Sequence, residues 1–232
     1  MSDGDIAADQ RRHWSRKAEE HAGTPQAVGS ESSPHKALRY RLIVDTIANL
    51  DGMSILDVGA GVGDFFGYLS VECPSADIQY TGVELTEALC AQGKEKYPGI
   101  DLRLLDIATE PDLPSKSFDY VVMSGLFHQH GSIPKERWAA HMLFLLERGF
   151  ALCRRGLAFN VLNCFAEFER PGNFHVDTIA LQADIAARMG RYFEVRNAYP
   201  LFETTFGVFR SEHVGSLYSD PSFHRYLREE SV

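Results

Sequence analysis

The residues with the clearest chemical potential lie in one short stretch, residues 55–66. Gly59, Gly61 and Gly63 alternate there, and such glycines let a backbone turn sharply and approach a ligand without interference from Cβ atoms. A dinucleotide fingerprint would need its third glycine at position 64, where the chain has Asp64. A carboxylate beside the loop would repel a pyrophosphate but is compatible with an ammonium group. The loop therefore favours a ligand that carries positive charge, and the alternative is a turn that only joins a strand to a helix.

Two further carboxylates end apolar segments later in the chain. Glu84 lies 25 residues after Gly59 and directly follows Val83, at the end of an expected strand. A carboxylate in this position can accept hydrogen bonds from both hydroxyls of a ribose, and a solvated surface acid is the alternative. Asp106 ends the next apolar segment and could equally be a helix cap or a turn residue.

Alternating strands and helices must position these residues. The apolar pattern predicts helices over 3–20, 34–50, 86–97, 134–154 and 177–189, another that begins near 65, and strands over 55–58, 78–84, 100–105, 118–124, 156–162, 193–197 and 205–210. This rhythm predicts an α/β domain with a doubly wound parallel sheet, whose ligands bind at the carboxyl ends of the strands. The rule gathers Asp57, the glycine loop, Glu84, Asp106 and the loop 124–130 at one edge of the sheet.

Four segments, taken in order, resemble the motifs of the class I S-adenosylmethionine (SAM) methyltransferases. They are Asp57-x-Gly59-x-Gly61-x-Gly63, Gly82-Val83-Glu84, Leu104-Leu105-Asp106-Ile107 and the segment 118–127. The resemblance implies a Rossmann-like, doubly wound seven-stranded sheet, mostly parallel with an antiparallel last strand. It also implies SAM as cofactor, with its ribose at Glu84, its adenine amino group at Asp106 and the adenine ring at the N–H of Ile107. The cofactor contacts that it implies are Asp57, Gly59, Ala60, Gly61, Asp64, Glu84, Leu85, Asp106, Ile107, Ser124 and Gly125.

The loop after the fourth strand is expected to flank the reacting centre. Methyl transfer from a sulfonium is an in-line displacement, so the protein mainly supplies proximity and orientation. Electron-rich ring faces can stabilise the sulfonium cation, and Phe127 is the ring expected to do so. His128 and His130 could act as a general base if the acceptor needs one, or could simply face water. No carboxylate or cysteine cluster accompanies the two histidines, so no metal site is expected.

Other residues are expected to close the site. The polar segment 1–33 is predicted to be a helical arm or lid over a SAM-binding domain at 34–232, with Trp14 covering the ligand; a frayed tail is the alternative. Ser33 is the expected N-cap of the next helix. Arg39, in that helix, could pair with the methionyl carboxylate or be solvated. The remaining candidate substrate or lid residues are Tyr40, Asn160, Phe174 and His175.

The composition narrows the possible partners. The 232 residues carry a net charge of −9 and no run of lysines or arginines, which argues against nucleic acid and against an acidic membrane surface. No segment approaches the ~20 apolar residues of a membrane span, and the polar N-terminus is unlike a signal peptide. The 4 cysteines show no Cys-x-x-Cys spacing, so free thiols in a cytoplasmic protein are expected. The oligomeric state stays open.

These observations favour a cytoplasmic methyltransferase that acts on a small molecule. The Asp-Pro-Pro-Tyr pattern of nucleic-acid amino methyltransferases is absent, and residues 124–127 stand in its place. Two alternatives remain. The first is a SAM-consuming cyclase that releases methylthioadenosine and forms a small ring amino acid of the azetidine-2-carboxylate type. The second is a SAM-binding protein without turnover.

Overall fold

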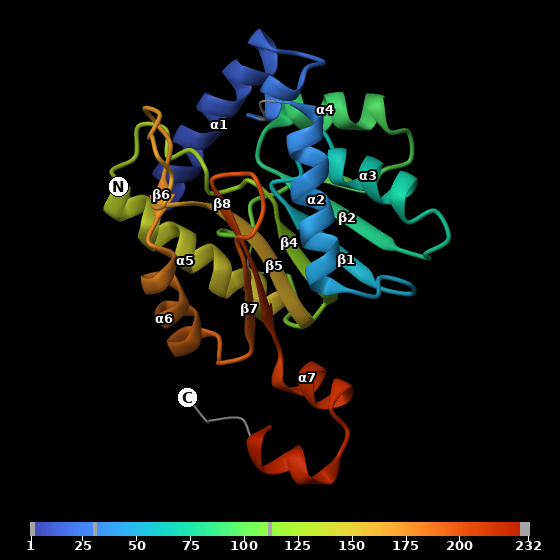
Figure 1. The fold of residues 1–232 in the computed structure, drawn as a ribbon. Coiled ribbons are helices and arrows are strands. Elements are labelled where there is room, and N and C mark those ends of the chain that lie inside the picture. Colours follow the sequence, from blue (N-terminus) through green and yellow to red (C-terminus); the bar gives the residue numbers. More distant parts are fainter. Residues whose placement is uncertain (1–2, 30–31, 111–112, 228–232) are drawn as a thin grey trace.

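The computed structural model describes residues 3–29, 32–110 and 113–227 (Figure 1). Its helices are α1 (Asp3–Glu20), η1 (Pro25–Val28), α2 (Ser33–Ile47), α3 (Asp64–Glu72), α4 (Glu87–Lys96), α5 (Lys135–Leu152), α6 (Thr178–Arg188), α7 (Ser211–Leu217) and η2 (Pro221–Tyr226), where η marks a 3-10 helix. Its strands are β1 (Ser54–Val58), β2 (Gln79–Glu84), β3 (Leu102–Leu104), β4 (Phe118–Met123), β5 (Cys153–Asn163), β6 (His175–Val176), β7 (Phe193–Arg196) and β8 (Glu203–Phe209).

All eight strands join one sheet, in the order β3-β2-β1-β4-β5-β8-β7, with β6 paired to the end of β5. The pairs on the β3 side of β5 are parallel, and β8 runs antiparallel to both β5 and β7. The predicted doubly wound sheet with an antiparallel last strand is therefore confirmed. The additional strand β6 was not predicted, because two residues are too few to show an alternating pattern.

Helices cover both faces of the sheet (Figure 1), as the alternation of side chains along its central strands requires. Ile55 of β1 and Tyr120 of β4 pack in the core on the side of α2, α3 and α4, whereas Leu56 and Val121 pack in the core on the side of α5 and α6. Because both faces are covered, the central strands read in the sequence as continuous apolar runs.

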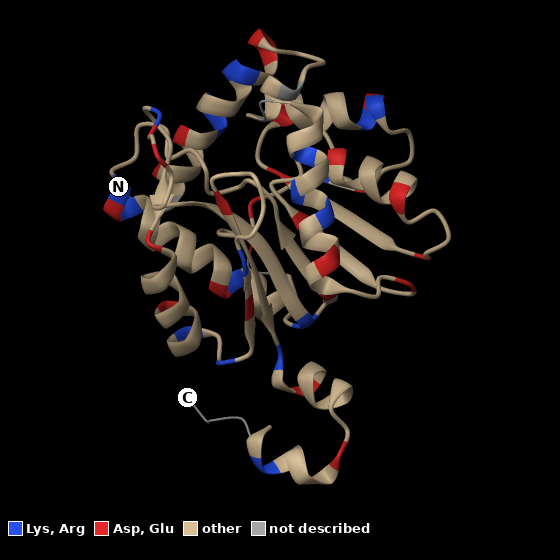
Figure 2. Ribbon diagram, in the orientation of Figure 1, with Lys and Arg blue, Asp and Glu red and all other residues tan. Residues whose placement is uncertain are grey.

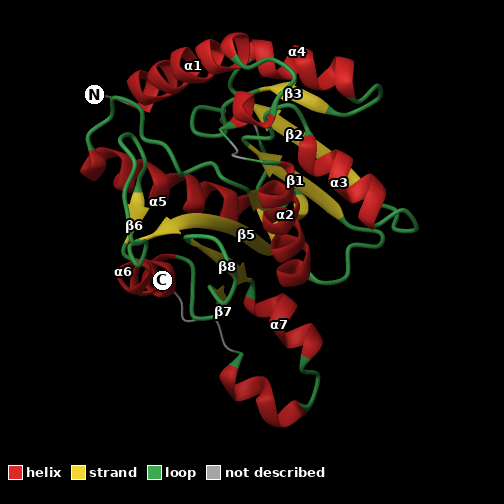
Figure 3. Cartoon of the chain, turned by 45° about the horizontal axis from the view of Figure 1, so that its top comes forward, coloured by secondary structure: helices red, strands yellow, loops and turns green. Residues whose placement is uncertain are grey.

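Three details differ from the sequence-based expectation. The N-cap of α2 is Ser32, whose hydroxyl accepts a hydrogen bond from the N–H of His35 at 3.4 Å, and not Ser33, which is the first helical residue. The strand expected over 100–105 is shorter and spans Leu102–Leu104. The C-terminal helices α7 and η2, which extend away from the sheet in Figures 1 and 3, were not predicted.

The first helix lies across the carboxyl end of the sheet, beside α4 (Figure 3). Gln92 of α4 donates a hydrogen bond to the carbonyl of Ala18 at 3.3 Å, and Ile6 and Ala18 are fully buried. This packing puts α1 above the strand ends where the sequence predicts a site. No helix in the described ranges is long and apolar enough to cross a bilayer.

Candidate active site

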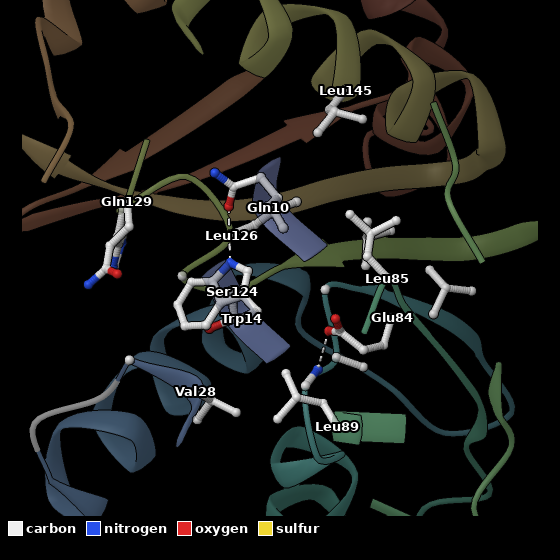
Figure 4. Close-up of a pocket in the computed structure, with 18 of the residues that line it drawn as sticks. Gln10, Trp14, Val28, Glu84, Leu85, Leu89, Ser124, Leu126, Gln129 and Leu145 are labelled. Carbon is white, nitrogen blue, oxygen red and sulfur yellow. Dashed lines mark hydrogen bonds between the residues drawn. The ribbon is translucent and has the colours of Figure 1, made fainter. Parts of the chain in front are cut away.

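A cavity lies at the carboxyl ends of β1, β2 and β4, under α1 and between α2 and α5 (Figure 4). The predicted residues that line it are Trp14, Arg39, Tyr40, Gly59, Ala60, Gly61, Asp64, Glu84, Leu85, Asp106, Ile107, Ser124, Gly125 and His128. Six other predicted residues lie off its lining, namely Asp57, Phe127, His130, Asn160, Phe174 and His175. Most of the predicted site residues therefore lie around one cavity, as expected from the rule that ligands bind at the carboxyl ends of parallel strands.

The glycine loop is held against β2 and approaches its neighbours closely. The N–H groups of Gly59 and Ala60 both donate to the carbonyl of Val83, at 2.9 and 3.1 Å. Gly59 has a φ of +73°, and a Cβ atom there would lie 2.6 Å from Cδ1 of Leu126 on the β4 exit loop. Glycine is favoured at this position, because a left-handed backbone strains other residues and a Cβ atom would force the Leu126 side chain to move.

Glu84 ends β2 and faces the glycine loop (Figure 4). Its carboxylate accepts hydrogen bonds from the N–H groups of Gly61 and Thr86, each at 2.9 Å. Burial raises the pKa of Glu84, and the backbone donors oppose this shift. Each carboxylate oxygen keeps further acceptor capacity beyond these bonds, so Glu84 can still accept from two hydroxyls of a ligand.

Asp57 is not placed to contact a ligand, contrary to the expectation for this residue. It is 3 % exposed, lies off the cavity lining and accepts a hydrogen bond from the Tyr80 hydroxyl at 2.7 Å. Burial, together with the nearby charge of Glu84, raises the pKa of Asp57 to about 7. A strand end can thus turn its side chain into the sheet, and Asp57 supports the site from below.

Asp64 lines the cavity, but its carboxylate is already paired with cationic side chains of the protein. Its carboxylate forms ion pairs with Lys36 of α2 and with Lys96 of α4, the latter at 2.6 Å. These bonds hold the pKa of Asp64 below its usual value against the effect of burial. The expected role beside a ligand ammonium therefore meets a carboxylate whose negative charge is already balanced by two lysines, which were not predicted to take part.

Asp106 and Ile107 lie where β3 leads into the next loop. One oxygen of Asp106 accepts from the N–H of Ala108 at 2.9 Å, whereas the buried Oδ2 has no hydrogen-bond partner. The Arg11 guanidinium approaches this oxygen only to 3.9 Å. A buried carboxylate oxygen is costly to leave unsatisfied, so its position in the cavity wall marks the place of a ligand donor.

The exit loop of β4 brings Ser124 and Gly125 to the cavity, but not the ring of Phe127. Phe127 is fully buried and packs edge-on against Phe159 of β5, with a centroid distance of 6.3 Å. Its carbonyl accepts a hydrogen bond from Nε1 of Trp138 at 3.1 Å. The expectation that Phe127 offers a ring face to the reacting centre is therefore corrected, because the loop turns this side chain into the core.

Arg39 also has a partner that differs from the expected one. Its guanidinium binds the carboxylate of Glu203 with Nε at 2.7 Å from Oε1 and 3.0 Å from Oε2. Glu203 is 2 % exposed, and the charge and hydrogen bonds of Arg39, together with the hydrogen bond from Asn160, lower its pKa despite burial. Glu203 was not predicted as a site residue, because only the pairing of β8 with β5 brings it to the site.

Asn160 connects this ion pair to His128. Its Oδ1 accepts from the N–H of Gly125 at 2.8 Å, so its Nδ2 faces Oε2 of Glu203 at 2.6 Å and Nε2 of His128 at 3.2 Å. Because both of these Nδ2 contacts require a donor, Nε2 of His128 is the acceptor and the ring proton sits on Nδ1. Burial lowers the pKa of His128 to about 4, so the ring is neutral at physiological pH.

Three other predicted residues serve the loops around the cavity. Nδ1 of His130 lies 2.6 Å from the carbonyl of Ile133, and Nδ1 of His175 lies 2.9 Å from the carbonyl of Asn163. Phe174 is 7 % exposed and belongs to the core. We therefore assign His130 to loop structure, because its Nδ1 is engaged by backbone outside the cavity, whereas His175 keeps a buried Nε2 that has no hydrogen-bond partner.

Helix α1 forms the roof of the cavity through Gln10 and Trp14 (Figure 4). The indole Nε1 of Trp14 donates to Oε1 of Gln10 at 3.0 Å, while the buried Nε2 of Gln10 has no hydrogen-bond partner. A Cβ atom on Gly29 would lie 2.9 Å from the Trp14 ring, so η1 and the turn after it press on the indole. Gln10 was missed in the sequence because a polar residue in a polar helix gives no signal.

These features fit SAM. The buried atoms without a hydrogen-bond partner include an acceptor on Asp106 and a donor on Gln10, both residues of the cavity lining, and the glycine loop with Glu84 forms a cradle that side chains would fill. The fold and the strand-end cavity define a nucleotide-binding α/β protein of the Rossmann-like class.

Comparisons with known proteins agree with this class. A family model described as a methyltransferase domain matches residues 55–149. A search of curated proteins found no match. Among solved structures, the chain resembles 1,6-didemethyltoxoflavin-N1-methyltransferase from Burkholderia thailandensis, with 14% identity, a TM-score of 0.63 and coverage of 90% of each chain. It also resembles magnesium protoporphyrin IX methyltransferase from Synechocystis PCC 6803, with 13% identity, a TM-score of 0.59 and coverage of 88% of this chain and 99% of that one. Residues 55–149 thus match a methyltransferase domain, and the chain shares the fold of these two methyltransferases.

Proposed function

We propose that this methyltransferase modifies a small-molecule acceptor that reaches the cavity beneath α1. The roof over the strand ends carries the proposal, because Gln10 and Trp14 cover the cavity there. Two solved neighbours in fold have small molecules in their names, namely 1,6-didemethyltoxoflavin and phosphoethanolamine. The SAM-binding domain 34–232 then holds the cofactor, and segment 1–33 is its lid.

Within this proposal, different residues of the site bind different parts of the cofactor. Glu84 accepts from the ribose hydroxyls, Oδ2 of Asp106 accepts from the adenine amino group, and the N–H of Ile107 meets the ring. The glycine loop, with Gly59, Ala60 and Gly61, supports the methionyl end. Bound SAM supplies an electrophilic methyl group on a sulfonium, and the chain contributes orientation and the exclusion of water.

His128 acts in this scheme as a positioning residue. Its Nε2 lone pair is engaged by Asn160, so the group left for an acceptor is the Nδ1 proton. A neutral imidazole with a pKa near 4 is a weak base, which suits hydrogen-bond donation better than proton abstraction. Arg39 and Glu203 hold Asn160, and through it the ring, in one orientation.

The test is a product assay with three arms. The protein is incubated with SAM alone, with SAM and a panel of small amines, phenols and carboxylates, and with SAM and total RNA. We expect S-adenosylhomocysteine only in the second arm. Methylthioadenosine in the first arm would instead show the cyclase reaction. S-adenosylhomocysteine that forms only when RNA is present would contradict a small-molecule acceptor.

A further inference from the structure

Helix α1 has two chemically different faces. Ala7, Gln10 and Trp14 point to the SAM cavity. A neighbouring face carries residues at positions i, i+3, i+4, i+7 and i+8, and its members are Asp9, Arg12, His13, Arg16 and Lys17. Four of these five residues are basic or can become so, in a chain whose net charge is −9.

This second face lines a surface groove next to the SAM cavity. The opposite wall comes from two loops and consists of Gln129, Gly131, Ser132, Pro171 and Gly172. Gln129 lines both the groove and the SAM cavity, so the two spaces share a wall. Basic residues of α1 are visible in Figure 2 along the upper left of the molecule, beside this pair of loops.

Two donors in the groove converge on a single acceptor. Nζ of Lys17 donates to Oε1 of Gln129 at 2.8 Å, and Nε2 of His13 lies 3.0 Å from the same atom. Both side chains are partly buried, and burial lowers the pKa of each. Among the described residues Lys17 has no ion-pair partner within 4.0 Å, and its nearest aromatic contact is Trp14, whose ring centroid lies 5.0 Å from Nζ.

The two carboxylates near the groove pair with its arginines and not with Lys17. Asp9 is bound to the hydroxyl of Ser132 at 2.7 Å and to Arg12 at 3.3 Å. Arg16 reaches Glu20 only at 4.0 Å, in an exposed pair of the kind that contributes little energy. Among the described residues, the partly buried ammonium of Lys17 is therefore held by one amide oxygen and by no carboxylate, with two exposed arginines beside it.

We propose that this groove binds an anionic group of the acceptor, a carboxylate or a phosphate, so that the methylated substrate is an acidic small molecule. The inference rests on the proposed function and deepens it. Lys17 and His13 are the primary anion ligands, and Arg12 and Arg16 supply the field around them. The shared wall at Gln129 lets a molecule anchored in the groove reach the methyl donor. A long polyanion fits less well, because the chain as a whole is acidic.

Calorimetry with the full chain tests this assignment. Inorganic phosphate and citrate are titrated separately at constant ionic strength into the wild type and into Lys17→Gln, Lys17→Arg and Arg12→Gln/Arg16→Gln. The double variant leaves the Lys17–Gln129 bond in place, so it separates loss of charge from loss of helix packing. Arg41→Gln in α2 is the matched control, because its side chain is 67 % exposed and remote from the groove.

We expect the wild type, Lys17→Arg and Arg41→Gln to bind at least one of the two anions. Lys17→Gln and the double variant should each bind it at least about tenfold more weakly, because each loses charge at the groove. SAM affinity is measured for every protein in parallel. Wild type that binds SAM but neither anion, or variants that bind the anion as well as wild type, would overturn the anionic groove and leave the methyltransferase assignment standing. Failure of wild type to bind SAM would instead overturn the proposed function and this inference with it.

Discussion

The guanidinium of Arg39 and the carboxylate of Glu203 form a bidentate ion pair between residues 164 positions apart in the sequence. The pair joins α2 to the start of β8 at the edge of the SAM cavity, and both side chains are largely buried. Asn160 binds the same carboxylate and carries its orientation to His128. One buried salt bridge therefore sets the geometry of the loop that faces the acceptor.

We predict that breaking this pair destabilises the fold strongly. Arg39→Ala leaves the Glu203 charge buried without its main partner, which should lower the free energy of unfolding by roughly 3–5 kcal/mol. A double-mutant cycle measures the coupling energy of the pair. Urea denaturation gives the stability of wild type, Arg39→Ala, Glu203→Ala and the double variant. The exposed pair Arg188–Glu147 is the control and should show a coupling of about 0–1 kcal/mol. Similar coupling energies for the two pairs would contradict this view.

Glu84 should dominate the affinity for SAM. Glu84→Ala removes an acceptor for the ribose hydroxyls, and hydrogen bonds to a charged group contribute about 1.5–3 kcal/mol each. We therefore expect calorimetry to show SAM binding weakened by at least about tenfold. Glu95→Gln, at an exposed position of α4, is the control and should bind as wild type does. The assignment fails if a folded Glu84→Ala variant keeps its affinity.

Two buried groups should make stability depend on pH with opposite signs. Asp57 has a pKa near 7, above its usual 3.8, so its contribution is present below pH ~4 and is lost as pH rises through ~7. His128 has a pKa near 4, below its usual 6.5, so its contribution is present above pH ~6.5 and is lost as pH falls through ~4. In the wild type, the loss of stability that Asp57 causes as pH rises from ~4 to ~7 is partly cancelled by the gain that His128 causes over the same range.

Asp57→Asn should remove the pH dependence of stability that comes from Asp57 and leave the one that comes from His128. The Asn side chain can still accept from the Tyr80 hydroxyl, so we expect the variant to fold. Its stability relative to wild type should rise between about pH 5 and about pH 8 by a few kcal/mol in urea denaturation. Asp77→Asn, at an exposed position, should show no such rise. A difference that stays constant with pH would show that Asp57 is ionised throughout.

The sequence predicted the sheet well because each central strand is a continuous apolar run that ends in a polar residue. The rule that ligands bind at strand ends then located Glu84, Asp106 and the glycine loop correctly on one cavity. It misplaced Asp57 and Phe127, because position along the chain does not say which way a side chain turns at the end of a strand. Both side chains turn into the core instead.

Residues from distant elements were beyond the reach of motif reasoning. Glu203 reaches the site through the antiparallel pairing of β8 with β5, and Gln10 reaches it through the packing of α1 across the strand ends. Lys36 and Lys96 form ion pairs with Asp64 from two different helices. None of these contacts follows from local spacing, because each depends on how separate elements come together.

Helix α1 should be held more firmly when SAM is bound. Gln10 and Trp14 line the cavity, and an unsatisfied donor on Gln10 can gain a partner from the ligand. Trypsin cleavage within α1 should therefore slow when SAM is present, while cleavage after Arg225 in η2, far from the cavity (Figure 1), should not change. Trp14→Ala should reduce the protection. Equal cleavage of α1 with and without SAM would argue against a lid.

The role of His128 can be tested by kinetics with an acceptor selected in the product assay. A positioning residue that donates from Nδ1 should cost less than about tenfold in turnover when replaced by alanine, whereas loss of a general base costs about 10²–10⁴-fold. Because the pKa of His128 is near 4, its protonation cannot shape the rate between pH ~6 and ~8. We therefore expect wild type and His128→Ala to have the same pH profile in that range.

His213→Ala is the matched control for this experiment. His213 contacts Tyr120 away from the cavity, so this variant should keep full activity. A loss above about 10²-fold in His128→Ala, with SAM affinity unchanged and a wild-type acidic limb that the variant lacks, would show that His128 is a base after all.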